Sequence, residues 1–185
     1  MKYFFFASTV ILLAVTLSAC RSSGPTQGSQ NLTLQTFKSF SVQVPEDWRR
    51  VNKENFANTI PEETVVLFLK PVDSTGFISN ANVVKESLNA DVSSLEYAKA
   101  NILLGSRAIT DYRQVSNAEA DVGAVKSVFH VFQARSSAAE PLLHYEQTYF
   151  AQDRIGYTVT CVAREDDAAT QVQCESVVKS FRFVQ

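Results

Sequence analysis

The sequence predicts an α+β fold in which two helices pack against an antiparallel β-sheet meander. Most of the chain after residue 40 consists of segments that alternate apolar and polar residues, the pattern of half-buried strands. Two segments with helical spacing of apolar residues, at about 94–107 and 168–181, interrupt and close this series. Because helices that cover an antiparallel sheet define the α+β class, these observations together predict an α+β sandwich.

The first half of the domain begins with three predicted strands. Residues 40–44 alternate apolar and polar side chains, and the turn sequence Pro45-Glu46-Asp47 leads into Trp48. We expect Trp48 to pack across this first hairpin, with a role as a binding aromatic as the alternative. The β-branched, apolar run 64–69 and the segment 82–88 are the next strands.

The first helix has a clear start signal. Ser93 is followed three residues later by Glu96, which is the pattern of a capping box with Ser93 as the N-cap residue. The apolar residues after the cap fall on one helical stripe that we expect to lie on the sheet: Leu95, Ala98, Ile102 and Ile109.

Four strands and a second helix follow. The segments 112–120, 124–135, 142–152 and 155–163 are joined by short links, which favours an antiparallel meander. The second helix is expected to begin at Asp166 or Asp167, and Cys174, Val178 and Phe181 share one of its faces.

Cys161 and Cys174 form an even pair in a chain that the N-terminal segment marks as exported. In an oxidising compartment a disulfide is the expected state of such a pair, and this one would fix the last helix to the last strand. Two free thiols or a metal site are the alternatives, and both need neighbours that the sequence does not supply.

Residues 1–19 have the order of a secretory signal: Lys2, then an uncharged apolar run, then small residues. An uncleaved membrane anchor is the alternative. The string Leu17-Ser18-Ala19-Cys20 resembles the lipobox of bacterial lipoproteins, and this resemblance implies that Cys20 becomes the acylated first residue of the mature chain. Two or more acyl chains anchor a protein stably.

The lipobox also divides the chain. Residues 20–32, with the lipidated Cys20 and a stretch rich in Ser, Gly, Gln and Thr, are expected to form a flexible tether. Residues 33–185 are then a single domain. We expect a lipid-anchored protein of the bacterial cell envelope, on the periplasmic face of the outer membrane if the cell is Gram-negative, because Arg21 rather than Asp follows Cys20.

Composition argues against a nucleic-acid partner. The chain has 17 Lys and Arg against 19 Asp and Glu, without long runs of either sign. Proteins that bind nucleic acid concentrate positive charge on one face. The membrane, through Cys20, and another envelope protein are therefore the expected partners.

No catalytic motif is present. The sequence lacks a nucleophile elbow, a Walker loop, a His-Glu-x-x-His pair and an EF-hand string, so no catalytic, cofactor-binding or metal-binding residue is predicted. His130 and His144 are expected to be solvent-facing or cross-strand polar residues; the alternative is a weak metal site with Glu146, if the two histidines approach. For the acids at 165–167, helix capping is favoured over a calcium site.

Two further features were weighed as binding surfaces. Five aromatic residues on successive strands are expected to build the core, with the lining of an apolar groove as the alternative: Phe129, Phe132, Tyr145, Tyr149 and Tyr157. The polar loops 71–80 and 135–141 are candidates because binding residues concentrate on loops held by a rigid scaffold.

Several strings resemble the PsbP-like family, which includes the bacterial DcrB-like lipoproteins and shares the Mog/PsbP fold, an α/β/α sandwich. The resemblance implies a non-catalytic accessory or binding protein for another envelope component. A carrier or sensor of a small apolar ligand held between helices and sheet is the alternative, and a hydrolase with an unrecognised site is less favoured. The strings are FSVQVPEDW from Phe40, NVVKE from Asn82, LEYAK from Leu95, GYTVT from Gly156 and SFRF from Ser180.

Overall fold

The computed structural model describes residues 31–58 and 60–184. The predicted signal segment, Cys20 and most of the predicted tether lie outside these residues. Within them, no helix has both the length and the apolar content needed to cross a membrane. The elements in chain order are β1 (Leu32–Thr36), β2 (Phe40–Pro45), β3 (Arg49–Val51), the 3-10 helix η1 (Lys53–Asn55), β4 (Thr64–Leu69), β5 (Asn80–Ser87), α1 (Ser94–Ala108), β6 (Thr110–Val122), β7 (Val125–Arg135), β8 (Leu143–Gln152), β9 (Ile155–Arg164), α2 (Ala168–Lys179) and β10 (Arg182–Phe183).

The larger sheet is antiparallel and has the strand order β3-β4-β5-β9-β8-β7-β6. The predicted meander of the last four long strands is confirmed, and its final strand, β9, returns to pair with β5. The link from β8 to β9 consists of Asp153 and Arg154, with φ angles of 53° and 59°. Positive φ at both positions is the geometry of a type I′ hairpin, which matches the twist of the strands it joins.

A second sheet was not predicted. β2, expected as part of a single meander, pairs instead with β1 and β10 in a three-stranded antiparallel sheet. Leu32, expected to be the last tether residue, is the first residue of β1. The small sheet packs on the large one through aromatic rings: the Phe181 ring lies 5.3 Å from that of Phe40 and 4.3 Å from that of Phe150, measured between centroids.

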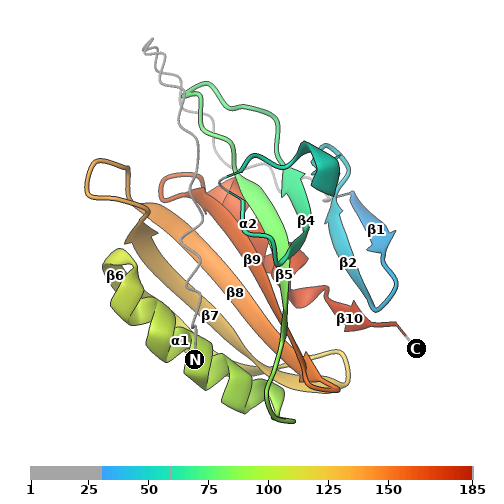
Figure 1. The fold of residues 1–185 in the computed structure, drawn as a ribbon. Coiled ribbons are helices and arrows are strands. Elements are labelled where there is room, and N and C mark those ends of the chain that lie inside the picture. The colour runs from blue at the N-terminus through green and yellow to red at the C-terminus, as the bar shows by residue number, and fades with distance from the viewer. Residues whose placement is uncertain (1–30, 59, 185) are drawn as a thin grey trace.

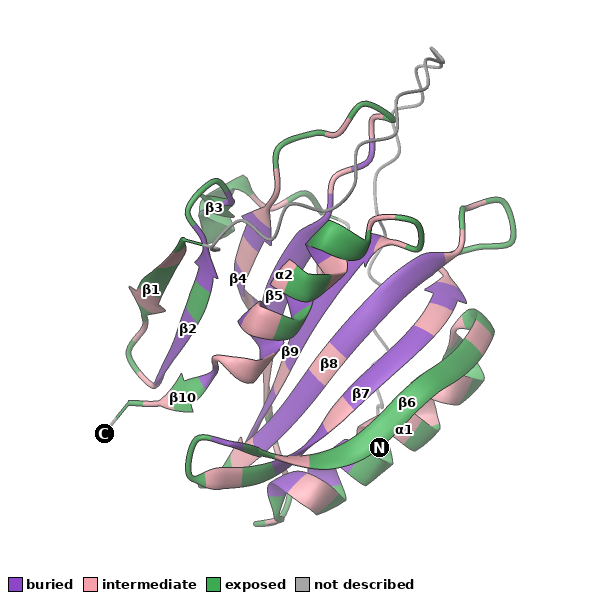
Figure 2. Cartoon of the chain, turned by 180° about the vertical axis from the view of Figure 1, so that it is seen from behind, coloured by how far each residue is buried: buried purple, intermediate pink, exposed green. Residues whose placement is uncertain are grey.

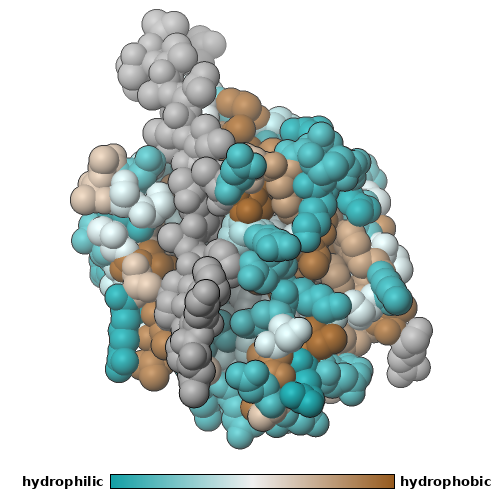
Figure 3. Space-filling view, viewed as in Figure 1, coloured by the Kyte–Doolittle hydropathy of each residue, from teal (hydrophilic) through white to brown (hydrophobic). Residues whose placement is uncertain are grey.

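The two helices lie on opposite faces of the larger sheet. Helix α1 covers β8, β7 and β6 on the face seen in Figure 1, whereas α2 and the small sheet cover the face seen in Figure 2. These layers confirm the predicted α+β sandwich with its α/β/α arrangement. In the space-filling view of the α1 face, hydrophilic and hydrophobic side chains are interspersed over the helix (Figure 3).

Helix α1 starts as predicted. The Ser93 side chain accepts a hydrogen bond from the Glu96 backbone N–H, and the Glu96 carboxylate accepts one from the Ser93 N–H at 2.8 Å, so the capping box is complete. The helix then places the buried ring of Tyr97 directly over Gly156 of β9. A Cβ atom at position 156 would lie 2.5 Å from this ring, so the helix approaches the sheet closely because this residue is glycine.

Candidate binding surface

The two loops singled out in the sequence lie at the same end of the larger sheet. In the antiparallel register Leu69 pairs with Asn80, and Leu143 pairs with both Ala134 and Arg164. The connections 70–79, 136–142 and 165–167 therefore project from one edge, next to the first turn of α2, as Figures 1 and 2 show. We call this region the loop end.

Asp73 organises the first of these loops. Its Oδ1 atom accepts hydrogen bonds from the Thr75 backbone N–H at 2.7 Å, the Thr75 hydroxyl at 2.5 Å and the Phe77 N–H at 3.1 Å. Partial burial raises the pKa of Asp73, but these bonds outweigh it and hold the pKa below its ordinary value. Phe77 is buried against Phe132 and Val162, so the loop is anchored in the core on the α1 side.

Arg164 ties this loop to the end of β9. Its Nη1 atom lies 3.4 Å from Asp73 Oδ2, and its Nε donates to Asp166 Oδ1 at 2.7 Å while Nη2 pairs with Asp166 Oδ2. The two-point contact lowers the pKa of Asp166 and raises that of Arg164. Both acids therefore stay ionised at neutral pH, and the guanidinium joins two connections of the loop end.

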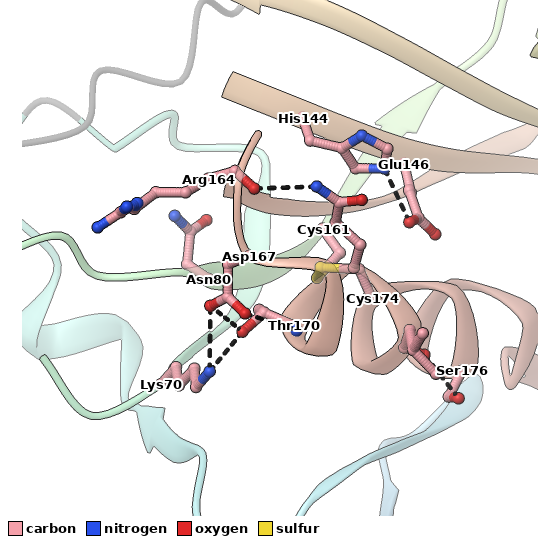
Figure 4. The surroundings of a disulfide bond; sticks show 12 residues. Lys70, Asn80, His144, Glu146, Cys161, Arg164, Asp167, Thr170, Cys174 and Ser176 are labelled. Carbon is pink, nitrogen blue, oxygen red and sulfur yellow. Dashed lines mark hydrogen bonds and ion pairs between the residues drawn. A yellow bond between two sulfur atoms is a disulfide. The ribbon is translucent and has the colours of Figure 1, made fainter. Parts of the chain in front are cut away.

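Lys70 ties the same loop to α2. Its Nζ atom lies 3.5 Å from Asp167 Oδ2 and also donates to the Thr170 hydroxyl, as Figure 4 shows. Asp167 is the N-cap residue of α2, because its Oδ1 accepts from the Thr170 backbone N–H at 3.0 Å. Capping is thus the role of this acid, as expected. Burial raises the pKa of Asp167, but the bonds from Thr170 and Lys70 outweigh it, so the pKa is lowered.

The predicted disulfide holds α2 from below. Cys161 of β9 and Cys174 of α2 are joined by an S–S bond, with their Cα atoms 5.2 Å apart and 13 residues between them in sequence. Both cysteines are fully buried (Figure 4). Together with the Lys70 and Arg164 contacts, the bond fixes the first turns of α2 relative to the loops.

This rigid frame exposes apolar side chains. Val72 in the first loop is 61% exposed and Val172 on α2 is 55% exposed. Pro71, Ala168 and Ala169 beside them are exposed too, and the carboxylates of residues 165–167 surround them. Apolar side chains that stay in water within a polar rim are typical of a protein interaction surface. The loop end is therefore the candidate binding surface.

His144 and Glu146 lie at the flank of α2. The His144 Nε2 atom is 3.0 Å from Glu146 Oε1, and its Nδ1 is 3.8 Å from Glu165 Oε2. The expectation that His144 and Glu146 share a face is confirmed. Burial raises the pKa of Glu146, whose Oε2 atom is buried without a hydrogen-bond partner.

His130 does not approach His144. In the β7–β8 register His130 pairs with Gln147, whereas His144 pairs with Gln133. Because side chains alternate along a strand, the two imidazoles lie on opposite faces of the sheet. The alternative of a shared metal site is therefore wrong. Among the residues that the structure describes, no group of three or more His, Cys, Asp or Glu side chains is placed to hold a metal ion.

His130 is only 1% exposed, so its expected place on a solvent face is also wrong. It is a cross-strand residue within a chain of hydrogen bonds, with its Nε2 2.9 Å from the Tyr112 hydroxyl and its Nδ1 3.1 Å from the Tyr149 hydroxyl. Tyr149 donates to Gln147 Oε1 at 2.5 Å. Burial lowers the pKa of His130 to about 4.

A neutral imidazole has one N–H, so the chain of bonds around His130 has a single direction. Because the Tyr149 hydroxyl donates its proton to Gln147, it accepts from His130 Nδ1–H, and Nε2 accepts from Tyr112. Both ring nitrogens are thereby occupied inside the protein. This arrangement stabilises the core and leaves His130 without access to a substrate.

The aromatic residues weighed as a groove lining form the core, as expected. Four of the five are buried, and the Phe132 and Tyr145 rings stack with centroids 4.8 Å apart: Phe132, Tyr145, Tyr149 and Tyr157. Phe129 is partly exposed, and the Lys179 ammonium lies 4.2 Å from its ring centroid. Trp48 is buried, which agrees with the core role expected for it.

Sequence reasoning missed the three residues that hold the loop end together. Asp73-Ser74-Thr75-Gly76 carried a local signal, because an Asp two residues before a hydroxyl residue and followed by Gly favours an Asx turn; Gly76 has φ of 84°. Lys70 and Arg164 carried none. Their partners lie 100 and 91 residues away in the sequence, and only the fold brings them together.

Solved structures share this arrangement of elements. Cyanobacterial PsbP from Synechocystis sp. PCC 6803 aligns with a TM-score of 0.56 and 13% identity, over 88% of this chain and 98% of its own. LpqN of Mycobacterium tuberculosis, involved in cell envelope biogenesis, has a TM-score of 0.53 and 12% identity, over 86% of this chain and 87% of its own. The Ran-binding protein Mog1p of Saccharomyces cerevisiae has a TM-score of 0.54 and 10% identity, over 85% and 97%.

These structural similarities establish the fold. The domain is PsbP-like, as the sequence resemblance implied. No family model and no curated protein sequence matches the chain. At 10–13% identity, the similarity extends to the backbone arrangement and not to the partners of any one protein.

Proposed function

We propose, from the PsbP-like fold and the loop end together, that the chain is a non-catalytic lipoprotein of the bacterial envelope that binds another envelope protein. The observation that carries the proposal is the loop end, where Val72 and Val172 stay exposed on loops braced by Asp73, Arg164 and Lys70. A surface held in one conformation loses little conformational entropy when it binds, which favours a recognition role.

The absence of a catalytic motif and the positions of the two histidines support a non-catalytic role. His130 has both ring nitrogens bonded to tyrosines, and His144 is paired with Glu146 on the other face. A general base must reach the proton that it removes. Neither histidine meets this requirement in the described structure.

Acylation of Cys20 would confine the loop end to a membrane surface. Restricting a binding site to the membrane where its partner lies raises the effective concentration of the two. Growth of cells with an alkyne-labelled fatty acid tests the anchor directly. The unmodified chain should incorporate the label and the Cys20→Ser variant should not, whereas label on the serine variant would contradict the anchor.

The binding surface is tested by photocrosslinking in intact cells. A photoreactive phenylalanine analogue at position 72 or 172 should yield a crosslink to one envelope protein. Leu103 is a matched control, because it is 51% exposed but lies on α1, on the opposite face of the sheet. The same product from all three positions, or none from 72 and 172, would refute a specific interface at the loop end.

A further inference from the structure

The longest open edge of the molecule is the outer side of β6. This strand ends the larger sheet, and 13 residues long it contrasts with β3, the three-residue strand at the opposite edge. Its residues are exposed almost throughout, and Figure 2 shows them along the border of the sheet. Within the described residues, no other strand pairs with this side. Its outward N–H and C=O groups are therefore available to a further strand.

Only part of this edge is regular. The register of β6 on β7 shifts between Thr110 and Arg113 and again between Gln114 and Ser116, so the first half is interrupted by bulges. Bulges bend a strand and disfavour pairing along its edge. From Ser116 to Val122 the register is unbroken. At about 3.3 Å per residue this stretch offers an edge of roughly 20 Å.

The regular stretch carries an unpaired negative charge pattern. Glu119 and Asp121 are exposed, they lie two residues apart and so project from the same face, and neither forms an ion pair within the described residues. The side chains between and before them, Ala118 and Ala120, are small. A strand that carries basic residues at the same two-residue spacing would meet the two carboxylates without steric hindrance.

The same charges disfavour a second copy of this chain. An antiparallel copy aligned on the stretch from Ser116 to Val122 places Glu119 at the centre, opposite its own equivalent. Like charges directly opposite each other destabilise a strand pair. The edge is therefore selective for a different, basic strand.

We propose that the outer edge of β6, from Ser116 to Val122, binds an extended segment of a partner protein whose Lys or Arg side chains face Glu119 and Asp121. This inference rests on the proposed binding function, and it adds a second contact on a different element from the loop end. Main-chain hydrogen bonds supply affinity in such strand addition, and the alternating side chains supply specificity.

The test uses a peptide of alternating Val and Lys and follows amide hydrogen exchange of the full chain in detergent by mass spectrometry. The peptide should slow exchange in residues 116–122 by at least tenfold at saturation, because new main-chain bonds form there. A matched peptide with the same charges, but N-methylated on alternate residues, should give no protection. No slowing in 116–122, or equal slowing by the methylated peptide, would overturn the proposal.

Charge reversal supplies the second arm. In a Glu119→Lys, Asp121→Lys variant, the Val-Lys peptide should lose its effect and a peptide of alternating Val and Glu should gain it. The fluorescence of buried Trp48 verifies that the variant remains folded. A variant that responds like the unmodified chain would refute the role of these two carboxylates. Either result is read at β6, so it is separate from the Cys20 labelling and from crosslinking at the loop end.

Discussion

The buried imidazole of His130 predicts a specific loss of stability on mild acidification. Its pKa is about 4 in the folded chain against an ordinary value of 6.5. Between these values the unfolded chain binds a proton that the folded chain does not, so the free energy of unfolding falls as the pH falls from 6.5 towards 4. With 1.36 kcal/mol for each pKa unit, the contribution lost between pH 7.5 and pH 5 is about 2 kcal/mol.

Glu146 acts in the opposite direction and must be separated from His130. Its raised pKa means that the folded chain takes up a proton first, which adds stability as the pH falls. Asp73, Asp166 and Asp167 have lowered pKa values, and their contribution is lost only below about pH 4. The difference between the unmodified chain and a His130→Gln variant, measured between pH 7.5 and 5, therefore isolates His130.

Urea unfolding at several pH values, followed by the fluorescence of Trp48, measures this difference; Trp48 is the single tryptophan and is buried. The unmodified chain should lose about 2 kcal/mol more than His130→Gln over this range. Tyr112→Phe is the matched control: it removes the bond to Nε2 but leaves the ring buried, so it should keep the pH dependence. Equal pH dependence of the unmodified chain and His130→Gln would refute the buried, neutral imidazole.

Two further predictions concern the packing of the helices. The Cys161→Ala, Cys174→Ala variant should lose about 3 kcal/mol of unfolding free energy in urea, because a loop of 13 residues is no longer closed in the unfolded chain; a loss equal to that caused by reducing agent alone is the check. Gly156→Ala should lose about 1–3 kcal/mol, since its Cβ would lie 2.5 Å from the Tyr97 ring. In contrast, Gly105→Ala on α1 has nothing within 4 Å of its Cβ and should gain about 0.5–1 kcal/mol; comparable losses at both glycines would contradict the close approach of α1.

Local signals were sufficient for the ends of the helices. The start of α1 at Ser93 depends on a hydrogen bond between residues three apart, and the start of α2 at Asp167 depends on the same spacing to Thr170. The positions of the last four long strands also followed from alternation along the chain. These features lie within a few residues of sequence, so the sequence alone specifies them.

The placement of β2 did not follow from its own sequence. Alternation identified residues 40–44 as a strand, but the choice between the two sheets depends on β10 and on the Phe181 ring, at the other end of the chain. A strand pattern states which side chains point inward and does not name the neighbouring strand. The second sheet was therefore found only in the tertiary structure.

The sequence by itself determined the α+β class, the helix caps, the cysteine pair and the expectation of an acylated Cys20, because each depends on short-range pattern or on residue chemistry. The tertiary structure decided that His130 and His144 lie on opposite faces, that Lys70 and Arg164 brace one end of the sheet, and that β6 is an open edge. Those outcomes depend on strand register and on contacts between residues about 100 positions apart, which the closure of the whole sheet fixes.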